Sequence, residues 1–209
     1  MACNKAVSMV IVAAVLGTAA PPTWADKNSG LYFGGGVGGS RMPDLSNLCN
    51  NQAPAAGITV TTCENKGFAW KGFAGYQFIR YFGVELGYYD FGKGTIKTAG
   101  GGQVDYKARG PYAGIVVTAP MTEKLSIIGR AGALRWSTKL NPDANATAAG
   151  FTGASDNGIN ASYGIGLEYM FTDHFGVRGE FERFLSVGND TTTGATNIDV
   201  WTVSGLFRF

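Results

Sequence analysis

Histidine, cysteine and long apolar runs are scarce in this chain of 209 residues. The only histidine is His174, and three cysteines are spread along the sequence. We therefore expect no metal site and no cofactor, because metal sites in proteins draw mainly on clustered histidines and cysteines. The longest apolar run, from Ala6 to Ala20, is shorter than the roughly twenty residues of a transmembrane helix. The formal net charge is only +2, which gives no argument for nucleic-acid binding.

The first 25 residues have the layout of a secretory signal. Lys5 precedes the apolar run, and a small-residue segment ends at Ala25, where we predict cleavage. Residues 1–25 are then a cleavable signal peptide, and residues 26–209 form one domain. Cys49 and Cys63 remain after export. An even pair in an exported chain is most simply a disulfide, which here would close one loop.

In the mature chain, Tyr, Phe, Val and Ile recur at every second position of many segments. No segment of helical length carries a stripe of apolar residues at helical spacing. This pattern predicts an all-β fold. The expected strands are 30–40, 67–78, 81–91, 104–119, 124–137, 159–171, 175–184 and 197–209. Short connections alternate with long polar ones, the long ones being 41–66, 92–103, 138–158 and 185–196. This asymmetry is typical of outer-membrane barrels, which have short periplasmic turns and long external loops.

A repeated segment assigns the two faces of the predicted sheet. Tyr76–Val84 matches Tyr169–Val177, and each copy places apolar residues at the same parity on both sides of a turn. The positions predicted to face outward are Phe68, Trp70, Tyr76, Phe78, Phe82, Val84, Leu86, Tyr88, Ala113, Ile115, Val117, Met121, Leu125, Ile127, Tyr163, Ile165, Leu167, Tyr169, Phe171, Val177, Phe181, Trp201, Val203, Phe207 and Phe209. The charged residues predicted to face inward are Lys71, Glu85, Arg130, Glu168, Arg178, Glu180, Glu182 and Arg208.

This polarity is the reverse of that in a water-soluble β-protein, which buries its apolar face. We therefore predict an eight-stranded antiparallel up-and-down transmembrane β-barrel in a bacterial outer membrane. A closed barrel leaves no unpaired backbone edge in lipid. The many glycines within the strands are expected to let aromatic neighbours lie close to the backbone and to let a narrow barrel curve.

Several segments, taken in order, resemble the OmpA-like small outer-membrane barrels over essentially the whole mature chain. They are Gly30–Gly38, Lys71–Tyr76 with Phe82–Tyr88, Phe171–Arg178 and Leu206–Phe209. The resemblance implies that Trp201, Val203, Phe207 and Phe209 form the terminal signal read by the barrel-assembly machinery. Because the sequence stops at Phe209, we expect it to lack the peptidoglycan-binding domain of larger family members.

The inward charges have two interpretations. Symmetry about the last short turn sets Glu168 opposite Arg178, and opposite charges on neighbouring strands attract. Four acids and four bases allow near-complete pairing of the buried ions, so the network is interpreted first as a plug that fills and fixes the lumen. The second interpretation is a gate in a narrow pore. A wide channel is not expected, because eight strands enclose little more than side chains.

Four outward cations, Lys107, Arg109, Arg135 and Arg183, are predicted at strand ends near the external loops. Lipopolysaccharide phosphates lie at that height in the outer leaflet, and guanidinium groups bind phosphate bidentately. The cations either hold lipopolysaccharide or are solvated rim charges. His174 falls in a predicted periplasmic turn, whereas lipid A lies in the outer leaflet. This position favours a turn-capping or solvated role for His174 over that of a catalytic base.

The leading functional hypothesis is a non-enzymatic structural or surface-interaction barrel that presents four external loops. A narrow ion or small-solute pore gated by the lumen charges is the second hypothesis, and a lipid A-modifying enzyme is the third. The expected partners are outer-membrane lipid, lipopolysaccharide, the barrel-assembly machinery and an unidentified extracellular partner. We expect a monomer.

Overall fold

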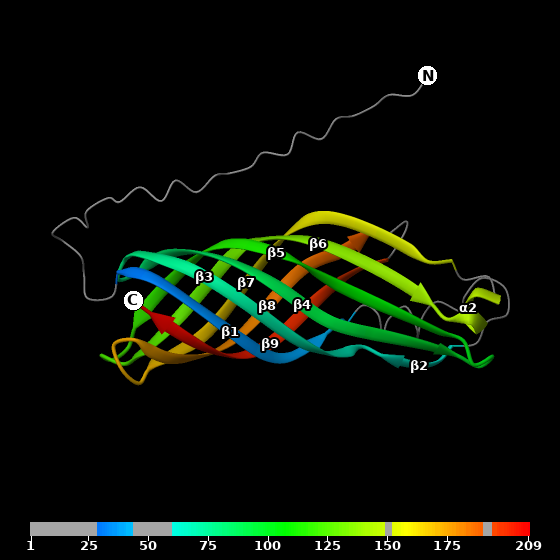
Figure 1. Ribbon diagram of the computed structural model, residues 1–209, viewed down its shortest axis with the longest axis horizontal. Coiled ribbons are helices and arrows are strands. Elements are labelled where there is room, and N and C mark those ends of the chain that lie inside the picture. The colour runs from blue at the N-terminus through cyan, green and yellow to red at the C-terminus, as the bar shows by residue number, and fades with distance from the viewer. Residues whose placement is uncertain (1–28, 44–59, 149–151, 190–193) are drawn as a thin grey trace, which may run out of the picture.

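The computed structural model describes residues 29–43, 60–148, 152–189 and 194–209. The predicted signal peptide and Cys49 lie outside these residues, and so does the predicted disulfide. Within them, eight antiparallel strands close into a barrel whose strands wind obliquely around its long axis (Figure 1). The strands are β1 Gly30–Arg41, β3 Lys66–Ile79, β4 Phe82–Thr98, β5 Gln103–Pro120, β6 Leu125–Pro142, β7 Ala154–Met170, β8 Phe175–Asn189 and β9 Gly194–Arg208. The predicted fold class is confirmed.

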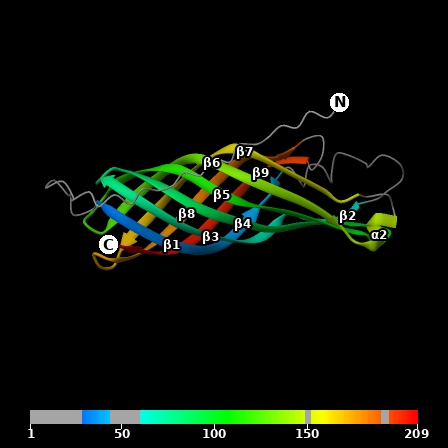
Figure 2. The same ribbon diagram turned by 45° about the horizontal axis from the view of Figure 1, so that its top comes forward.

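Neighbours in the sequence are neighbours in the barrel, and the first and last strands close it. Strand β1 pairs with both β3 and β9, and the register places Glu168 opposite Arg178, as the symmetry of the β7–β8 turn predicts. The short turns and the C-terminus lie at one end, and helix α2 (Ala144–Ala148) lies at the other (Figures 1 and 2). In the described part of the chain, no helix is long and apolar enough to cross a membrane.

The strands extend further toward the α2 end than the sequence predicted. The expected loop 92–103 is a hairpin in which β4 and β5 pair up to Lys97 and Gln103, and β6 and β7 pair within the expected loop 138–158. A ninth strand, β2 (Val60–Glu64), lies inside the expected loop 41–66 and pairs only with β4. The exposed positions of these segments are mostly polar, as at Lys93, Lys97 and Lys139. With few apolar outward residues, these segments have the sequence pattern of polar loops.

Aromatic side chains on the outer face mark two levels of the barrel. Trp70, Tyr88, Tyr163 and Trp201 are exposed toward the α2 end, and Phe78, Phe82, Phe171 and Phe209 are exposed toward the short turns. The nine residues from Trp201 to Phe209 separate the two levels on β9, which agrees with about 9–11 residues for a tilted transmembrane strand. We call the wall between these levels the membrane part and the strands beyond the first level the external part.

Glycines allow close contacts inside this narrow barrel. The Phe73 ring lies against Gly34, where an added Cβ would come within 2.9 Å of Cε2 of that ring, and the Tyr32 ring lies against Gly75 in the same way. A larger residue at either position would displace a buried ring, so the two glycines make room for the aromatic side chains of the lumen.

Candidate functional site

The lumen of the membrane part holds a cluster of charged side chains from six strands. All eight predicted inward charges are buried there. They are Lys71, Glu85, Arg130, Glu168, Arg178, Glu180, Glu182 and Arg208. Alternation along each strand directs these side chains inward, because their neighbours in sequence face outward; these neighbours are apolar residues or glycines except Arg183, which follows Glu182. The barrel thus gathers charges that lie up to 137 positions apart in the sequence.

The charges form a continuous chain of alternating sign. Lys71 contacts Glu180 and lies 3.0 Å from Glu182. Arg130 then bridges Glu180, at 2.7 Å, and Glu85. We call this series, together with its continuation to Arg208, the lumen network.

The lumen network continues toward the short turns through a second arginine. Arg178 donates to Glu85 at 2.8 Å and to Glu168 at 2.7 Å, and Arg208 donates to the other oxygen of Glu168 at 3.1 Å. Each carboxylate therefore contacts at least two donors. Desolvating a charge costs several kcal/mol unless partners compensate, so this shared pairing is what allows eight charges to occupy a closed interior.

Aromatic rings flank the arginines of the lumen network. The Arg178 guanidinium lies 5.4 Å from the Tyr32 ring and 5.1 Å from the Phe73 ring, and Arg130 lies 5.1 Å from the Tyr112 ring. Tyr32 also donates to Glu85 at 3.1 Å. Guanidinium groups stack favourably on aromatic faces. The rings therefore fill the space around the ions and hold their orientation.

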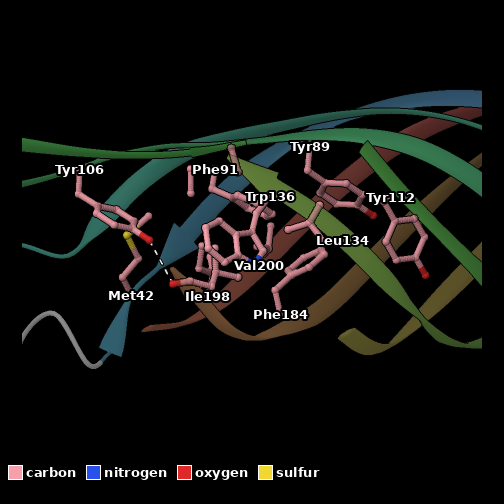
Figure 3. Close-up of a cluster of buried hydrophobic side chains, with 13 residues drawn as sticks. Met42, Tyr89, Phe91, Tyr106, Tyr112, Leu134, Trp136, Phe184, Ile198 and Val200 are labelled. Atoms are coloured by element: carbon pink, nitrogen blue, oxygen red, sulfur yellow. Dashed lines mark hydrogen bonds between the residues drawn. The ribbon is translucent and has the colours of Figure 1, made fainter. Parts of the chain in front are cut away.

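A second cluster, made of buried apolar side chains, lies inside the barrel toward the external part (Figure 3). We call it the aromatic cluster. Its members are Met42, Ala69, Tyr89, Phe91, Tyr106, Ala108, Tyr112, Leu134, Trp136, Phe184, Val187, Ile198 and Val200. Phe184 packs against Phe91 and Tyr89, with ring centroids 4.8 and 5.0 Å apart. Tyr89 joins the two clusters, because its hydroxyl donates to Glu182 at 2.8 Å.

The sequence prediction missed the aromatic cluster. Its signal was present, since Tyr89, Phe91 and Phe184 have the same inward parity as Glu85 and Glu182. A prediction that places apolar residues only on the outward face gives the inward apolar positions near the strand ends no role.

The four predicted rim cations do not all share one environment. Lys107, Arg109 and Arg135 are exposed on the outer face of β5 and β6. Arg183 instead makes two hydrogen bonds to Asp199, at 2.5 and 2.7 Å, which occupy its guanidinium. Lys107 and Arg109 line a pocket of about 420 Å³ together with Lys93 and Lys139. The sequence predicted loops at Lys93 and Lys139.

Comparisons with known proteins agree with this architecture. The family model for the OmpA-like transmembrane domain matches residues 26–209. The chain belongs to the OmpA-like transmembrane domain family. Outer membrane protein A of Yersinia pseudotuberculosis is 28% identical over 197 residues, which cover 91% of this chain and 51% of that protein. Outer membrane protein P5 of Haemophilus influenzae is 27% identical over 209 residues, which cover 94% and 58%.

Solved structures share the OmpA-like barrel fold. Neisserial surface protein A has a TM-score of 0.59 at 13% identity, with 87% of this chain and 98% of that chain covered. OprG of Pseudomonas aeruginosa has a TM-score of 0.54 at 18% identity, with 87% and 97% covered. The chain spans about half the length of the curated relatives it matches. Its fold and family place it in the bacterial outer membrane.

The last strand of this OmpA-like barrel carries the residues predicted as an assembly signal. Trp201, Val203 and Phe209 are exposed on its outer face, and Phe207 is half-buried between the rings of Phe33, Phe175 and Phe209. The four side chains therefore share one face of the strand, and their reading by the assembly machinery stays a prediction.

His174 lies in the β7–β8 turn, at the end with the short connections. Its Nδ1 is 3.0 Å from the Arg208 carbonyl oxygen, and its backbone carbonyl accepts from the Arg208 amide at 2.8 Å. The ring stacks on Phe207. These contacts tie the turn to the end of the last strand and place the imidazole at the opposite end of the barrel from the rim cations.

Proposed function

We propose that this chain is a non-enzymatic structural barrel with a sealed lumen, which carries a rigid external part as an interaction platform. The observation that supports this most directly is the stacking of the lumen network and the aromatic cluster along one axis, joined by the hydrogen bond from Tyr89 to Glu182. An ion that crossed the barrel would have to separate buried ion pairs and then displace packed rings.

The external part suits a platform because strands, and not only loops, project beyond the membrane. The outer face of the β4–β5 hairpin carries Lys93, Lys97 and Asp105, while Val104 and Tyr106 are buried beneath them. Loops on a rigid scaffold are the usual carriers of binding. The β4–β5 hairpin carries its turn, residues 99–102, away from the membrane part.

The sealed-lumen proposal is tested by conductance of the full chain in planar bilayers. We expect wild-type barrels to be essentially silent. Arg130→Gln disrupts the lumen network, and Phe184→Ala opens the aromatic cluster without changing any charge. If both clusters seal the barrel, each single variant stays silent and only the combined variant conducts. Steady conductance by wild-type protein would contradict the proposal.

A narrow gated pore is the second candidate, and it is supported by buried polar atoms without a protein partner. Among the described residues these include the Tyr112 hydroxyl, Arg130 Nε, Thr202 Oγ1 and Ser204 Oγ. Such atoms usually bind internal water. A small cavity at the short-turn end, lined in part by Glu168 and Arg208, also leads toward the network. Conductance by Arg130→Gln alone, with Phe184 intact, would favour this gate.

The absence of enzymatic activity is proposed from the position of His174. Its imidazole contacts a backbone carbonyl and the Phe207 ring at the short-turn end, whereas lipid A occupies the leaflet at the other end. His174→Ala should leave the lipid A mass spectrum of expressing cells unchanged. A modification that appears with wild-type protein and disappears with this variant would overturn the assignment.

A further inference from the structure

The external part of β7 forms an open edge of the sheet. Its residues 154–161 pair with β6, whereas the pairing of β7 with β8 begins only at Ser162, opposite Phe184. In the part of the chain that the structure describes, no other strand pairs with this segment. Figure 1 shows the yellow β7 running on past the tip of the orange β8 arrow. We call residues 154–161 the β7 edge.

Strand β8 separates from β7 where it bends over the lumen. Its pairing with β9 is irregular between Phe184 and Val187, and Ser186 has a φ of 47°. Val187 is buried in the aromatic cluster, and its carbonyl oxygen accepts a hydrogen bond from the Tyr106 hydroxyl at 3.2 Å. Tyr106 belongs to β5, which β6 and β7 separate from β8. The end of β8 therefore packs into the aromatic cluster and leaves the β7 edge without a second neighbour.

The backbone groups that point to the open side of β7 belong to alternate residues. The Met170 amide donates toward β6, to the Lys124 carbonyl oxygen, and the Phe171 amide donates toward β8, to the Phe175 carbonyl oxygen. This direction alternates from residue to residue along a strand, and the register between β6 and β7 is regular throughout. The residues whose N–H and C=O groups point away from β6 are therefore Ser155, Asn157, Ile159 and Ala161.

The β7 edge has little of the protection that edge strands usually carry. Proline, charged side chains and bulges normally prevent such strands from pairing with another chain. The β7 edge contains no proline and one charged residue, Asp156, whose carboxylate accepts a hydrogen bond from the Asn157 amide at 2.7 Å. Ile159 is 68% exposed, although it lies on the external side of Tyr163 and thus outside the membrane part. An edge of this kind is a template for an added strand.

Two cations of β6 set the charge that an added strand would meet. Lys139 is opposite Ser155 and Arg135 is opposite Ile159, and Lys139 is also opposite Lys107, a like charge. Strands lie about 4.8 Å apart, so an added strand would lie about 10 Å from β6. The short side chain of Ser155 leaves room for Lys139 to reach across it to a glutamate. The β7 edge therefore favours an acidic residue opposite Ser155 and an apolar residue opposite Ile159.

We infer that the β7 edge is a docking site for an extended, acidic polypeptide segment of an extracellular protein, which pairs with it as an added strand. Main-chain hydrogen bonds supply the affinity, and the side chains opposite Ser155 and Ile159 supply the specificity. This rests on the proposed role of the external part as an interaction platform, and it names the chemistry of the partner. A second copy of this chain fits less well, because the outward positions of its own β7 edge carry no acidic residue.

The test measures binding of a short fluorescent peptide to the full-length chain in detergent by fluorescence anisotropy. The peptide is rich in threonine and carries an isoleucine followed four positions later by a glutamate, the order that antiparallel pairing with Ile159 and Ser155 requires. We expect Ile159→Pro to weaken binding about tenfold or more, because it removes an edge N–H without breaking the ladder to β6. The matched control Ile159→Val keeps the N–H and should bind as wild type does. No binding to wild type, or an equal loss in both variants, would overturn the added strand.

Two altered peptides separate strand addition from general charge attraction. A peptide of the same sequence, N-methylated at alternate residues along its pairing edge, keeps every side chain but cannot donate to the β7 edge, and it should not bind. A peptide with lysine in place of the glutamate should bind more weakly than the original, and Lys139→Gln should weaken binding of the glutamate peptide alone, by up to about fivefold. Equal binding of the N-methylated peptide would overturn strand pairing, and equal binding of the lysine peptide would overturn the acidic partner.

Self-association, folding and the sealed lumen are measured separately. Sedimentation in detergent should show a monomer, and a dimer that Ile159→Pro dissociates would assign the β7 edge to a second copy and overturn the acidic partner. The heat-dependent shift in electrophoretic mobility should persist in every variant, because edge strands tolerate proline. If Ile159→Pro does not fold, the N-methylated peptide tests the same hydrogen bonds on wild-type protein. The bilayer conductance of the variants should equal that of wild type, so failure of peptide binding and failure of the sealed barrel are distinguishable.

Discussion

The membrane part and the external part of this barrel share the same strands but have opposite polarity. Between the two aromatic levels, the outer face is apolar and the lumen holds eight charges. Beyond the upper level, β4, β5 and β6 carry lysines outward and bury Phe91, Tyr106 and Trp136. The solvent outside each region explains the difference, because lipid stabilises apolar outer side chains and water stabilises charged ones.

The change of polarity occurs within single strands and needs no break in the sheet. On β4 the inward residue Glu85 is followed at the same parity by Gly87, Tyr89 and Phe91, so the lumen turns from ionic to aromatic within six residues. Tyr89 is suited to the boundary, since its ring packs on Phe184 and its hydroxyl reaches Glu182. A tyrosine is apolar at one end and polar at the other.

The largest effect is expected from breaking the ionic interior of the membrane part. Arg178→Met leaves Glu85 and Glu168 without the arginine that joins them, and breaking a buried pair typically costs about 3–5 kcal/mol. We expect a loss of that size in the free energy of unfolding, measured by urea unfolding in lipid vesicles. Arg178→Met/Glu85→Gln/Glu168→Gln should recover part of it, because no uncompensated carboxylate then remains at either position. A single variant as stable as wild type would show that the network contributes little.

A smaller effect is expected when the same residue type is introduced on the outer face of each region. Leu86→Arg places a charge on the lipid-facing wall, between the aromatic levels marked on β4 by Phe82 and Tyr88, and should cost about 2–4 kcal/mol. Asn157→Arg places it on the water-facing wall of the external part, opposite the uncharged Ser137, and should change stability by less than about 0.5 kcal/mol. Urea unfolding of the two variants in the same vesicles measures the difference. Equal losses would contradict the assigned boundary.

The smallest effect is expected at Asp105 on the external part, and it depends on pH. Partial burial raises the pKa of the Asp105 carboxyl, but hydrogen bonds from Gln103, Thr95 and Lys93 outweigh it, so the pKa lies below its ordinary value of 3.8. The resulting stabilisation is present above that ordinary value and is lost as the pH falls through the lower pKa of the folded state.

Asp105→Asn should therefore lower stability at pH 7 by no more than about 0.5 kcal/mol, since solvent screens exposed pairs. The difference from wild type should shrink toward pH 2. Parallel unfolding curves at the two pH values measure it. A stability difference that grows in acid would show that the ionised Asp105 carboxylate does not stabilise the folded state.

Sequence reasoning found the membrane part because two signals agreed there. The repeat around Tyr76 and Tyr169 set the parity of the outward residues, and the charged positions then fell on the other face. The structure places those charges in the lumen and Glu168 opposite Arg178. The external part was missed because Lys93, Lys139 and their neighbours read as polar loop, and a strand with a water-facing outer wall has no apolar outward residues to reveal it.

The pocket lined by Lys93, Lys107 and Lys139 could not be predicted from the sequence for a different reason. Lys93, Lys107 and Lys139 come from three strands and lie close together only through the register of β4, β5 and β6. That register depends on the irregularity near Gly92, which shifts the pairing between Asp90 and Lys93. Alternation along one strand predicts which face a residue occupies but does not predict its neighbours on the next strand after such a shift.

By itself, the sequence determined the inside and the outside of the membrane wall, since a period of two residues fixes the face of every side chain once one position is known. Only the tertiary structure decided which charges pair, where the lumen turns aromatic and which cations converge. These features depend on contacts across the barrel and between strands. Pairing register and closure set such contacts, and neither is encoded in the alternation of any single strand.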